Sequence, residues 1–223
     1  MIKLSKRLET IAKIILNGNS KKIIDVGCDH ALLDIYLVQN NENLNVVASD
    51  INELPLKNAR KNIEKYSFLN KIELSLRDGI KNIDDEIDTI VISGMGYETI
   101  KGILLNGKKE LENVDRLVIS SNNKYEKVRE EITSIGYVIN YEEIVYEDGK
   151  YYIIIEFIKG NKKYNKKELY FGPVLISNKE NNFYAYYNYI RDTKISILES
   201  LPKEYEKRKK VEKEIELLNE ELK

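Results

Sequence analysis

The chain has little of the residue types that build disulfides and metal sites. Among its 223 residues Cys28 is the single cysteine and His30 the single histidine. One cysteine excludes an internal disulfide framework and fits a reducing compartment, so a cytoplasmic location is expected. One histidine excludes a metal site built from several histidines, and no metal is expected.

The chain also lacks long apolar runs and an excess of either charge. Charged residues interrupt the amphipathic segment 1–16, so neither a signal peptide nor a membrane span is expected there, and no membrane partner. Because 36 Lys and Arg face 37 Asp and Glu, total charge says nothing about nucleic acid. Segments 1–22 and 159–167 are locally basic, which indicates either solvated surface or contacts to a phosphate backbone.

Apolar runs alternate with helical patterns through most of the chain. Strands are expected at residues 22–26, 45–50, 71–76, 87–93 and 116–120. Helices are expected between them at residues 30–39, 54–66, 97–105 and 125–135, and before them in a segment that Ser5 caps. Strands that alternate with helices predict an α/β fold with a parallel sheet covered on both faces.

The last two strands are expected to form an antiparallel pair. Residues 137–146 and 151–158 are β-rich, and Asp148-Gly149 between them is a hairpin signal. The sequence thus predicts a seven-stranded, mostly parallel sheet ending in an antiparallel hairpin. This ending is typical of Rossmann-like methyltransferases and unusual in dehydrogenases. The domain that carries it is expected to span residues 1–160.

Composition changes after residue 160. Residues 160–167 are polar and basic and predict a linker, and 170–173 predict a turn with apolar anchors. Two helical patterns with apolar residues at a spacing of four and three then predict an antiparallel, coiled-coil-like hairpin. A single dimerising coiled coil is the alternative, which Pro202 disfavours. The second domain is therefore expected at residues 161–223.

The most informative motif is the turn Asp25-Val26-Gly27-Cys28-Asp29-His30. An apolar strand enters it, a helix is expected to follow from Asp29 and His30, and Asp50 closes the next strand. This is the layout of a nucleoside-cofactor site in a Rossmann-type fold. Asp29 stands at the second glycine position of G-x-G-x-x-G, where an acid would repel a pyrophosphate. The motif therefore favours S-adenosylmethionine over NAD.

The acids of this expected cofactor site have specific expected roles, and several of its positions also have a simpler alternative. Asp25 braces the loop or meets the methionine ammonium, Asp50 accepts from the ribose hydroxyls, and Asp78 accepts from the adenine amine. The alternatives are a plain turn at Gly27, a helix cap at Asp29 or Asp50, a plain turn at Asp78 and a structural His30. The expected cofactor-binding residues are Asp25, Gly27, Asp29, His30, Asp50, Ile51, Asp78, Gly79 and Gly94.

The reacting centre is expected where the fourth and fifth strands end. Ser93-Gly94-Met95-Gly96-Tyr97 offers backbone space for a flat base, which Met95 and Tyr97 would flank, and Asn122 could bond a base edge. No G-x-S-x-G elbow, Walker loop, Asp-Pro-Pro-Tyr or Asn-Pro-Pro-Tyr occurs. The last absence favours a ring nitrogen such as adenine N1, which attacks without prior deprotonation. The catalytic candidates are Gly94, Met95, Gly96, Tyr97 and Asn122.

These motifs together resemble the bacterial tRNA (adenine-22)-N1-methyltransferases. The resemblance runs from Ser5-Lys6-Arg7-Leu8 through the Gly27 turn and Gly94-Met95-Gly96 to Phe171-Gly172-Pro173, and so covers essentially the whole chain. The chain departs from the family at Asp34 and before Asn122, where the family usually has proline, and at Tyr97, where it usually has glycine.

The resemblance implies methyl transfer from S-adenosylmethionine to N1 of adenosine 22 in the D-arm region of tRNA. That atom lies inside folded RNA, so the base must be flipped out. Lys6, Arg7, Lys162, Lys163 and the helical hairpin would then contact tRNA, and the protein would be a monomer or weak dimer. Two alternatives stay open: a methyltransferase acting on a small molecule or protein, and a degenerate fold that only binds RNA.

Overall fold

The computed structural model describes residues 2–202 and 208–223. The chain divides into two compact units, one that runs to Val174 and one from Leu175 to Lys223. The first unit therefore continues past residue 160, where the sequence placed the domain boundary.

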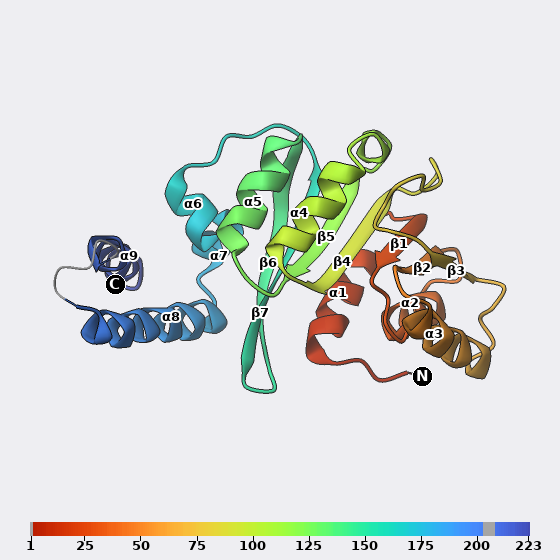
Figure 1. Ribbon diagram of the computed structural model, residues 1–223, viewed down its shortest axis with the longest axis horizontal. Coiled ribbons are helices and arrows are strands. Elements are labelled where there is room, and N and C mark those ends of the chain that lie inside the picture. Colours follow the sequence, from red (N-terminus) through yellow and green to blue (C-terminus); the bar gives the residue numbers. More distant parts are fainter. Residues whose placement is uncertain (1, 203–207) are drawn as a thin grey trace. The chain divides into compact units, whose positions relative to one another are not determined.

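The first unit is built on a seven-stranded sheet within the described residues, in the order β3-β2-β1-β4-β5-β7-β6 (Figure 1). Strands β1 to β5 pair in parallel, and β7 pairs antiparallel with both β5 and β6. The expected sheet and its antiparallel ending are confirmed. The strands are β1 (Lys22–Val26), β2 (Asn45–Asp50), β3 (Ile72–Leu76), β4 (Thr89–Met95), β5 (Arg116–Ser121), β6 (Tyr137–Glu147) and β7 (Lys150–Lys159).

Helices cover both faces of this sheet (Figure 1). Helices α1 to α5 lie close to their expected positions, whereas α6 and α7 were not expected. The helices described up to residue 178 are α1 (Lys6–Leu16), α2 (Leu32–Asn40), α3 (Glu53–Lys65), α4 (Tyr97–Asn106), the short 3-10 helix η1 (Glu110–Glu112), α5 (Tyr125–Ser134), α6 (Lys166–Phe171) and α7 (Pro173–Asn178).

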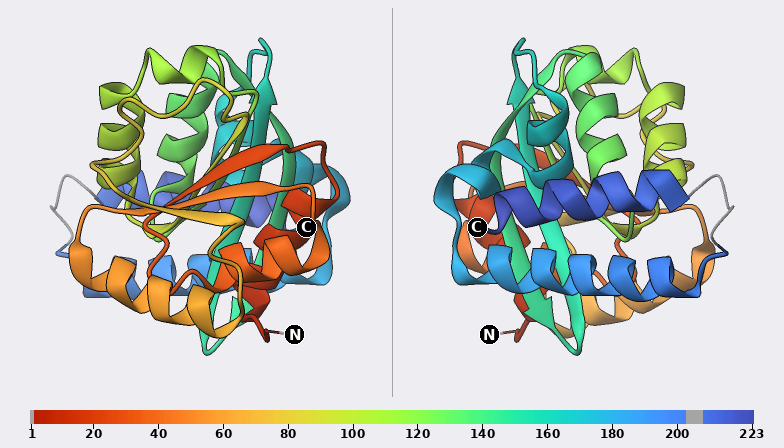
Figure 2. Two further views of the ribbon diagram at one scale, coloured as in Figure 1. Left: turned by 90° about the vertical axis from the view of Figure 1, so that its right-hand side faces the viewer. Right: turned by 90° about the vertical axis from the view of Figure 1, so that its left-hand side faces the viewer.

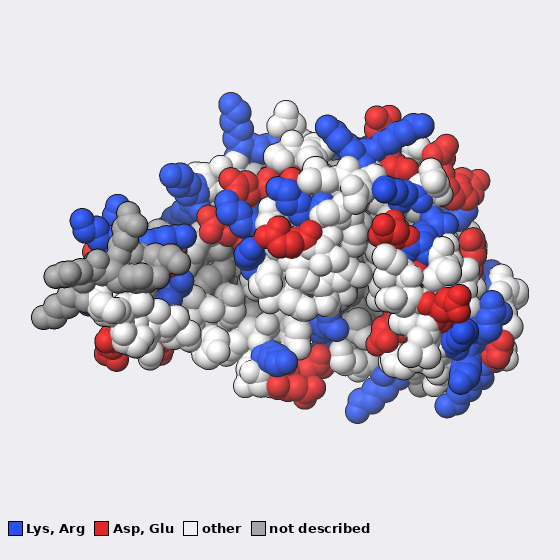
Figure 3. Space-filling model, in the orientation of Figure 1, with Lys and Arg blue, Asp and Glu red and all other residues white. Residues whose placement is uncertain are grey.

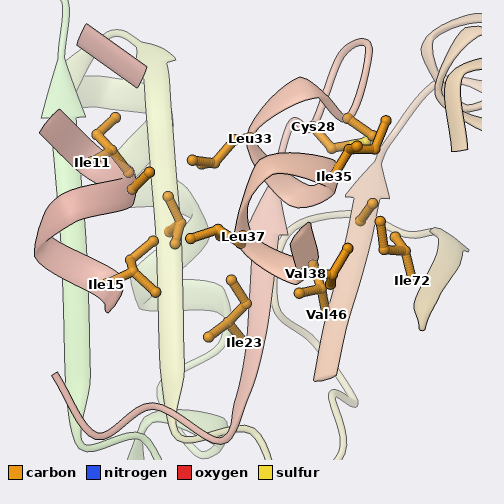
Figure 4. Close-up of a cluster of buried hydrophobic side chains, with 14 of the residues drawn as sticks. Ile11, Ile15, Ile23, Cys28, Leu33, Ile35, Leu37, Val38, Val46 and Ile72 are labelled. Atoms are coloured by element: carbon orange, nitrogen blue, oxygen red, sulfur yellow. The ribbon is translucent and has the colours of Figure 1, made fainter. Parts of the chain in front are cut away.

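One face of the sheet packs against α1 and α2. Ile11 and Ile15 of α1 and Leu37 of α2 are buried against Ile23 of β1 in one apolar cluster (Figure 4). Helix α1 begins as expected, because the Ser5 side chain accepts a hydrogen bond of 3.3 Å from the Leu8 backbone N–H. This packing fixes the start of α1 against the sheet, and so places Lys6 and Arg7.

The β6–β7 hairpin turns at Asp148 and Gly149, with φ of 49° and 79°. Positive φ at both central residues is the two-residue turn that Asp-Gly favours, so the expected hairpin is confirmed. Since β7 runs against β5, pairing Ile119 with Ile155 and Arg116 with Ile158, the hairpin tip lies toward the carboxyl ends of the parallel strands. Residues 160–165 follow β7 at the opposite edge (Figure 1).

A buried ion pair anchors the segment after β7. Arg129 of α5 and Glu142 of β6 are both fully buried, with Nε and Oε1 2.6 Å apart. Arg129 Nη1 also donates to the carbonyls of Leu169 and Tyr170 at 2.9 and 3.1 Å. Helix α6 starts with a capping box between Asn165 and Glu168. The region expected to be a linker and a turn is therefore partly helical and held to the first unit.

The second unit contains α8 (Asn181–Ser200) and α9 (Arg208–Glu221). Lys194 pairs with Glu214, Lys179 pairs with Glu221, and Arg208 donates to the carbonyl of Leu198. The ends of one helix thus meet the opposite ends of the other, so the two lie antiparallel and side by side (Figure 2). This arrangement is the expected helical hairpin.

Arg129→Met should destabilise the first unit by about 3–5 kcal/mol, because it leaves Glu142 buried without its partner. The free energy of unfolding in urea measures this loss. The matched control is Lys127→Met in the same helix, which removes the exposed Lys127–Glu130 pair. The control should cost less than about 1 kcal/mol. Equal losses in the two variants would contradict the anchoring role.

Candidate functional site

The candidate site lies at the carboxyl edge of β1, β2, β4 and β5. The strand order reverses between β1 and β4, where connections leave in opposite directions along the sheet. Such a switch point opens a crevice at the strand ends, where α/β folds bind their ligands. The expected cofactor turn and the expected reacting turn end the two strands at this point, β1 and β4.

Gly27 forms the sharp turn after β1. Its φ is 81°, and the backbone N–H groups of Gly27 and Cys28 both donate to the carbonyl of Ser49, at 2.8 and 3.0 Å. A Cβ added at Gly27 would overlap the terminal methyl of Met95. The turn therefore needs glycine for its conformation, and it brings β1 against the end of β4.

The residues after Gly27 form an open turn and do not start the helix. Asp29 and Ala31 have φ of 50° and 55°, and α2 begins at Leu32 with Ala31 at its N-cap position. The expectation that Asp29 and His30 begin the helix is therefore wrong, and so is the alternative that Asp29 caps it. Both side chains are exposed, with His30 Nε2 3.7 Å from Asp29 Oδ1. Because Asp29 and Ala31 both adopt the left-handed backbone conformation, the turn is longer than expected and α2 starts only at Leu32.

Asp25 places a buried carboxyl group beside this turn. Its side chain is 5% exposed. Burial raises the pKa of Asp25 to about 7, the neighbouring Arg7 guanidinium opposes this shift, and the carboxylate of Asp50 adds to it. Asp25 therefore gains its full negative charge only in the presence of a compensating cation or above neutral pH.

A second buried acid, Asp34 of α2, lies close enough to Asp25 to interact with it. Asp34 is 0% exposed, and neither carboxyl oxygen accepts a hydrogen bond from another described residue. Burial and then the charge of Asp25 raise the pKa of Asp34 well above its usual range. The sequence marked Asp34 only as a departure from the family and gave it no role.

Cys28 shares this environment and is not a reactive thiol. Burial, followed by the charges of Asp34, Asp25 and Asp50, raises its pKa. The expectation of a small filling residue without an activated thiolate agrees with this burial.

The acids expected to hold the nucleoside lie at the same edge. Asp50 is half-buried, and its Oδ1 accepts from the Asn52 backbone N–H at 2.9 Å, in a turn before α3. Ile51 is 61% exposed and Asp78 is also exposed. Gly79 follows with φ of 66°, and a Cβ there would press on Ile103 of α4. Asp50, Ile51 and Asp78 thus remain accessible to a ligand.

The end of β4 is shaped by a bulge at Gly94, whose φ is 80°. Asn122 donates from its backbone to the carbonyl of Met95 at 2.8 Å and from its side-chain Nδ2 to the carbonyl of Gly94 at 2.6 Å. Its Oδ1 accepts no hydrogen bond from the described residues. The structure therefore brings Gly94, Met95 and Asn122 together, with one amide acceptor available.

Tyr97 is held by contacts to the end of β5 and to α5. Its backbone N–H donates to Asn123 Oδ1 at 3.1 Å, which ties Gly96 and Tyr97 to the end of β5. Its buried side chain reaches α5, where the hydroxyl bonds Glu131 Oε2 at 3.1 Å. Gly96 keeps its place in the turn, whereas the Tyr97 ring does not join the Gly94–Asn122 group.

Arg7 is brought to the same edge by α1. Its Nη1 donates to Ser93 Oγ at 2.7 Å, and its guanidinium lies 5.1 Å from the ring centre of Tyr152. The backbone N–H groups of Lys6 and Arg7 donate to the carboxylate of Glu147 at 2.5 and 3.4 Å. The sequence analysis did not identify Tyr152 or Glu147 as site residues, and both lie close to the hairpin turn at Asp148-Gly149.

Lys162 and Lys163 do not join the site. They lie in residues 160–165, at the opposite edge of the sheet, and Lys162 Nζ lies 5.1 Å from the Tyr164 ring centre. On the face drawn in Figure 3, acidic and basic side chains are intermixed over the first unit. Of the expected tRNA contacts, the structure places Lys6 and Arg7 at the site and leaves the second basic segment apart from it.

A hollow at the opposite edge is a weaker candidate. Lys13, Asn17, Arg116 and Glu156 line it. Arg116 already pairs with Glu156 and donates to the carbonyl of Ile14, so its charge is used within the fold. In the described residues no cluster of His, Cys, Asp or Glu is suited to a metal ion. None of the helices described is long and apolar enough to cross a membrane.

The buried acids make stability depend on pH. Asp34 binds a proton in the folded chain at pH values where the unfolded chain, with a pKa near about 3.9, has lost it. Its contribution is therefore favourable at low pH and is lost as pH rises, by about 1.4 kcal/mol for each pH unit. Asp34→Asn should therefore gain stability relative to the wild type by roughly this slope as pH rises above about 5, up to the pH at which the folded chain releases the proton.

Urea unfolding at several pH values measures this difference. The control is Glu53→Gln, which removes an exposed carboxylate from a surface pair with Lys57. Its stability relative to the wild type should hardly change with pH. Parallel pH profiles for Asp34→Asn and the wild type would show that Asp34 is ionised in the folded protein.

Comparison with known proteins agrees with this geometry. The model of the tRNA (adenine(22)-N(1))-methyltransferase family matches residues 23–220. A tRNA (adenine(22)-N(1))-methyltransferase of Bacillus subtilis is 35% identical over 162 residues, which is 72% of this chain and 67% of that protein.

Solved structures match over nearly the whole chain. TrmK of M. capricolum in complex with S-adenosyl-homocysteine is 33% identical with a TM-score of 0.87, covering 98% of this chain and 97% of that one. A Streptococcus pneumoniae protein in complex with S-adenosyl-L-methionine is 29% identical with a TM-score of 0.90, covering 99% and 100%. The resemblance stated from the motifs is confirmed: the chain belongs to the tRNA (adenine(22)-N(1))-methyltransferase family.

Proposed function

We propose that this protein transfers a methyl group from S-adenosylmethionine to N1 of adenosine 22 in the D-arm region of tRNA. The observation that carries the proposal is the single sheet edge that joins the Gly27 turn, with Asp25 and Asp50, to the Gly94–Asn122 group. Family membership favours tRNA over a small-molecule or protein substrate and over a module that only binds RNA.

The residues at the edge suit a cationic nucleoside cofactor. Gly27 has no side chain and is covered only by the flexible end of Met95, and the buried Asp25 carboxyl lacks a full counter-charge. We infer that Asp25 faces the methionine ammonium, that Asp50 accepts from the ribose hydroxyls, and that Asp78 accepts from the adenine amine. Ile51 and Gly79 would border the adenine, and Gly94 would border the sulfonium. Asp29 and His30 would border the charged methionine part of the cofactor.

The end of β4 suits a flat target base. Gly94 and Gly96 leave backbone space, and Met95 offers an apolar side chain that can adapt its shape. Asn122 is held by two hydrogen bonds to the Gly94-Met95 backbone, so its Oδ1 has a fixed direction. We infer that this oxygen accepts from the exocyclic amine of adenine, which orients the adjacent N1. Tyr97 would contribute through its backbone tie to Asn123.

This arrangement requires no strong general base. Adenine N1 has an in-plane lone pair and no proton, so it forms the new N–C bond directly and becomes positively charged. S-Adenosylmethionine supplies the methyl group and keeps the electron pair of the broken S–C bond. The residues of the chain therefore act by position and charge: they align the base, exclude water and keep acids near the cationic groups.

Basic residues would hold the RNA around the flipped base. Arg7 is fixed by Ser93 and Tyr152 next to Gly94, and Lys6 is exposed beside it. We infer that both contact phosphate or the target nucleotide. We propose a separate set of tRNA contacts at Lys162, Lys163 and the helical hairpin. We further propose that residues 1–160 form the catalytic part and that residues 161–223 form the RNA-contacting part. We also propose that the protein acts in the cytoplasm as a monomer or weak dimer.

The direct test of this function maps the methylated nucleoside. Purified protein, S-adenosylmethionine and an unmodified tRNA transcript should yield 1-methyladenosine, located at position 22 by digestion and mass spectrometry. A transcript with guanosine at position 22 is the matched control and should accept no methyl group. Methylation of both transcripts, or of neither, would contradict the proposal.

Gly27→Ala should weaken binding of S-adenosylhomocysteine by about fivefold or more. A Cβ there is strained at positive φ and meets Met95, which is a cost of roughly 1–3 kcal/mol. Calorimetric titration measures the affinity. Gly102→Ala is the control, since no atom lies within 4 Å of an added Cβ there. Unchanged affinity in Gly27→Ala would place the cofactor elsewhere.

Arg7→Gln and Lys6→Glu should weaken tRNA binding, and Lys6→Glu, which does not act on Asp25, should leave S-adenosylhomocysteine affinity unchanged. A charged hydrogen bond is worth roughly 1.5–3 kcal/mol, so Arg7→Gln should cost about tenfold or more. The slope of binding against salt should fall by about one for each phosphate group that the variant no longer neutralises. Filter binding over a salt series measures both effects. Lys162→Glu, at the opposite edge, tests the second basic segment separately. Wild-type tRNA affinity in Arg7→Gln and Lys6→Glu would exclude their proposed role.

A further inference from the structure

Asp34 is a fully buried acid that the proposed reaction does not use. No other described residue donates a hydrogen bond to its carboxyl oxygens. An ionised carboxylate in such surroundings is costly, and the usual result is that the group takes up a proton. A buried acid at a position where the family usually has proline therefore calls for a functional explanation.

Asp25 and Asp34 occupy the same side of the sheet. Ile23 of β1 packs in the cluster formed with α1 and α2 (Figure 4). Asp25 lies two residues on in the same strand, so it is on the same face of the sheet. Asp34 is on α2 between Leu33 and Ile35, both of which belong to that cluster. Asp25 is 5% exposed and Asp34 0% exposed, so Asp25 keeps slight access to the surface and Asp34 has none.

The groups around this pair give it little positive charge. Arg7 of α1 favours the ionised form of Asp25, while Asp50 of β2 opposes it. The Cys28 thiol in the turn is buried and neutral, since its pKa is raised. His30 is exposed and faces Asp29 at 3.7 Å. Of the charged groups that act on Asp25, Arg7 is thus the cation. Three acids, Asp25, Asp34 and Asp50, share this neighbourhood.

We propose that Asp25 and Asp34 form a proton-holding pair beneath the cofactor site, and that the pair releases a proton to solvent when the cationic cofactor binds. The inference rests on the proposed function for the identity of the cofactor. An ammonium or sulfonium group beside Asp25 stabilises its carboxylate and lowers the proton affinity of both acids. Binding should therefore strengthen as pH rises, by about tenfold for each pH unit below neutrality.

The first measurement is infrared spectroscopy of the empty protein at pH 8. The wild type should show the carbonyl stretch of a neutral carboxylic acid, because Asp34 keeps its proton. Asp34→Asn should lack this band, and Glu53→Gln should retain it. A wild-type protein without the band would overturn the inference, whatever the cofactor does.

The second measurement counts protons by calorimetric titration with S-adenosylhomocysteine in two buffers of different ionisation enthalpy. Near pH 6.5 both the wild type and Asp34→Asn should release a proton from Asp25. At pH 8, where an ordinary histidine is neutral, the wild type should still release part of a proton from Asp34 and Asp34→Asn none. Adenosine, which lacks the charged methionine part, should release none from either protein.

The outcomes separate this inference from the proposed function. Tight binding with equal heats in both buffers at both pH values would overturn the proton-holding pair and leave the methyltransferase intact. Equal release by the wild type and Asp34→Asn at pH 8 would remove Asp34 from the pair. Proton release on binding, without methyl transfer to tRNA, would support the pair and overturn the proposed function.

Discussion

The structure depends on one electrostatic constraint: a carboxyl group is buried where the first strand of a parallel sheet ends. Asp25 is held there by the pairing of β1 with β2 and β4, and its pKa is raised to about 7 by burial. Gly27 turns the chain directly after β1, so the Asp25 carboxyl group stays buried next to the carboxyl edge of the sheet. Such a position is unfavourable for the empty protein and favourable for a cationic ligand. The same feature that costs stability therefore supplies binding.

Ordinary packing and hydrogen bonding position the other parts of the site around the Asp25 carboxyl group. Helix α1 is fixed by Ile11 and Ile15, which brings Arg7 to Ser93 and Tyr152. The bulge at Gly94 and the amide of Asn122 hold the end of β4 in one conformation. Arg129 and Glu142 fasten the segment that leads away from the sheet. Each element thus contributes backbone position, and few side chains remain for the chemistry itself.

The sequence was sufficient to predict the alternating strands and helices, the final hairpin and the edge where the site lies. Period-two and helical patterns encode these features locally, and Asp148-Gly149 encodes the turn. The sequence could not predict what depends on contacts between distant segments. The direction of the Tyr97 ring follows from Glu131, the short helices after β7 depend on Arg129, and the left-handed Asp29 and Ala31 delay the start of α2. The isolation of Asp34 from hydrogen-bond donors is likewise a property of the packed fold.

A crystal structure of this protein with bound S-adenosylhomocysteine tests the central claim most directly. The account predicts the ligand at the carboxyl edge, with its ammonium toward Asp25, its ribose at Asp50, and the Met95 methyl displaced from Gly27. A ligand bound at the opposite edge, in the hollow lined by Lys13, Arg116 and Glu156, would contradict it. So would a ligand at the expected edge whose ammonium pointed away from Asp25.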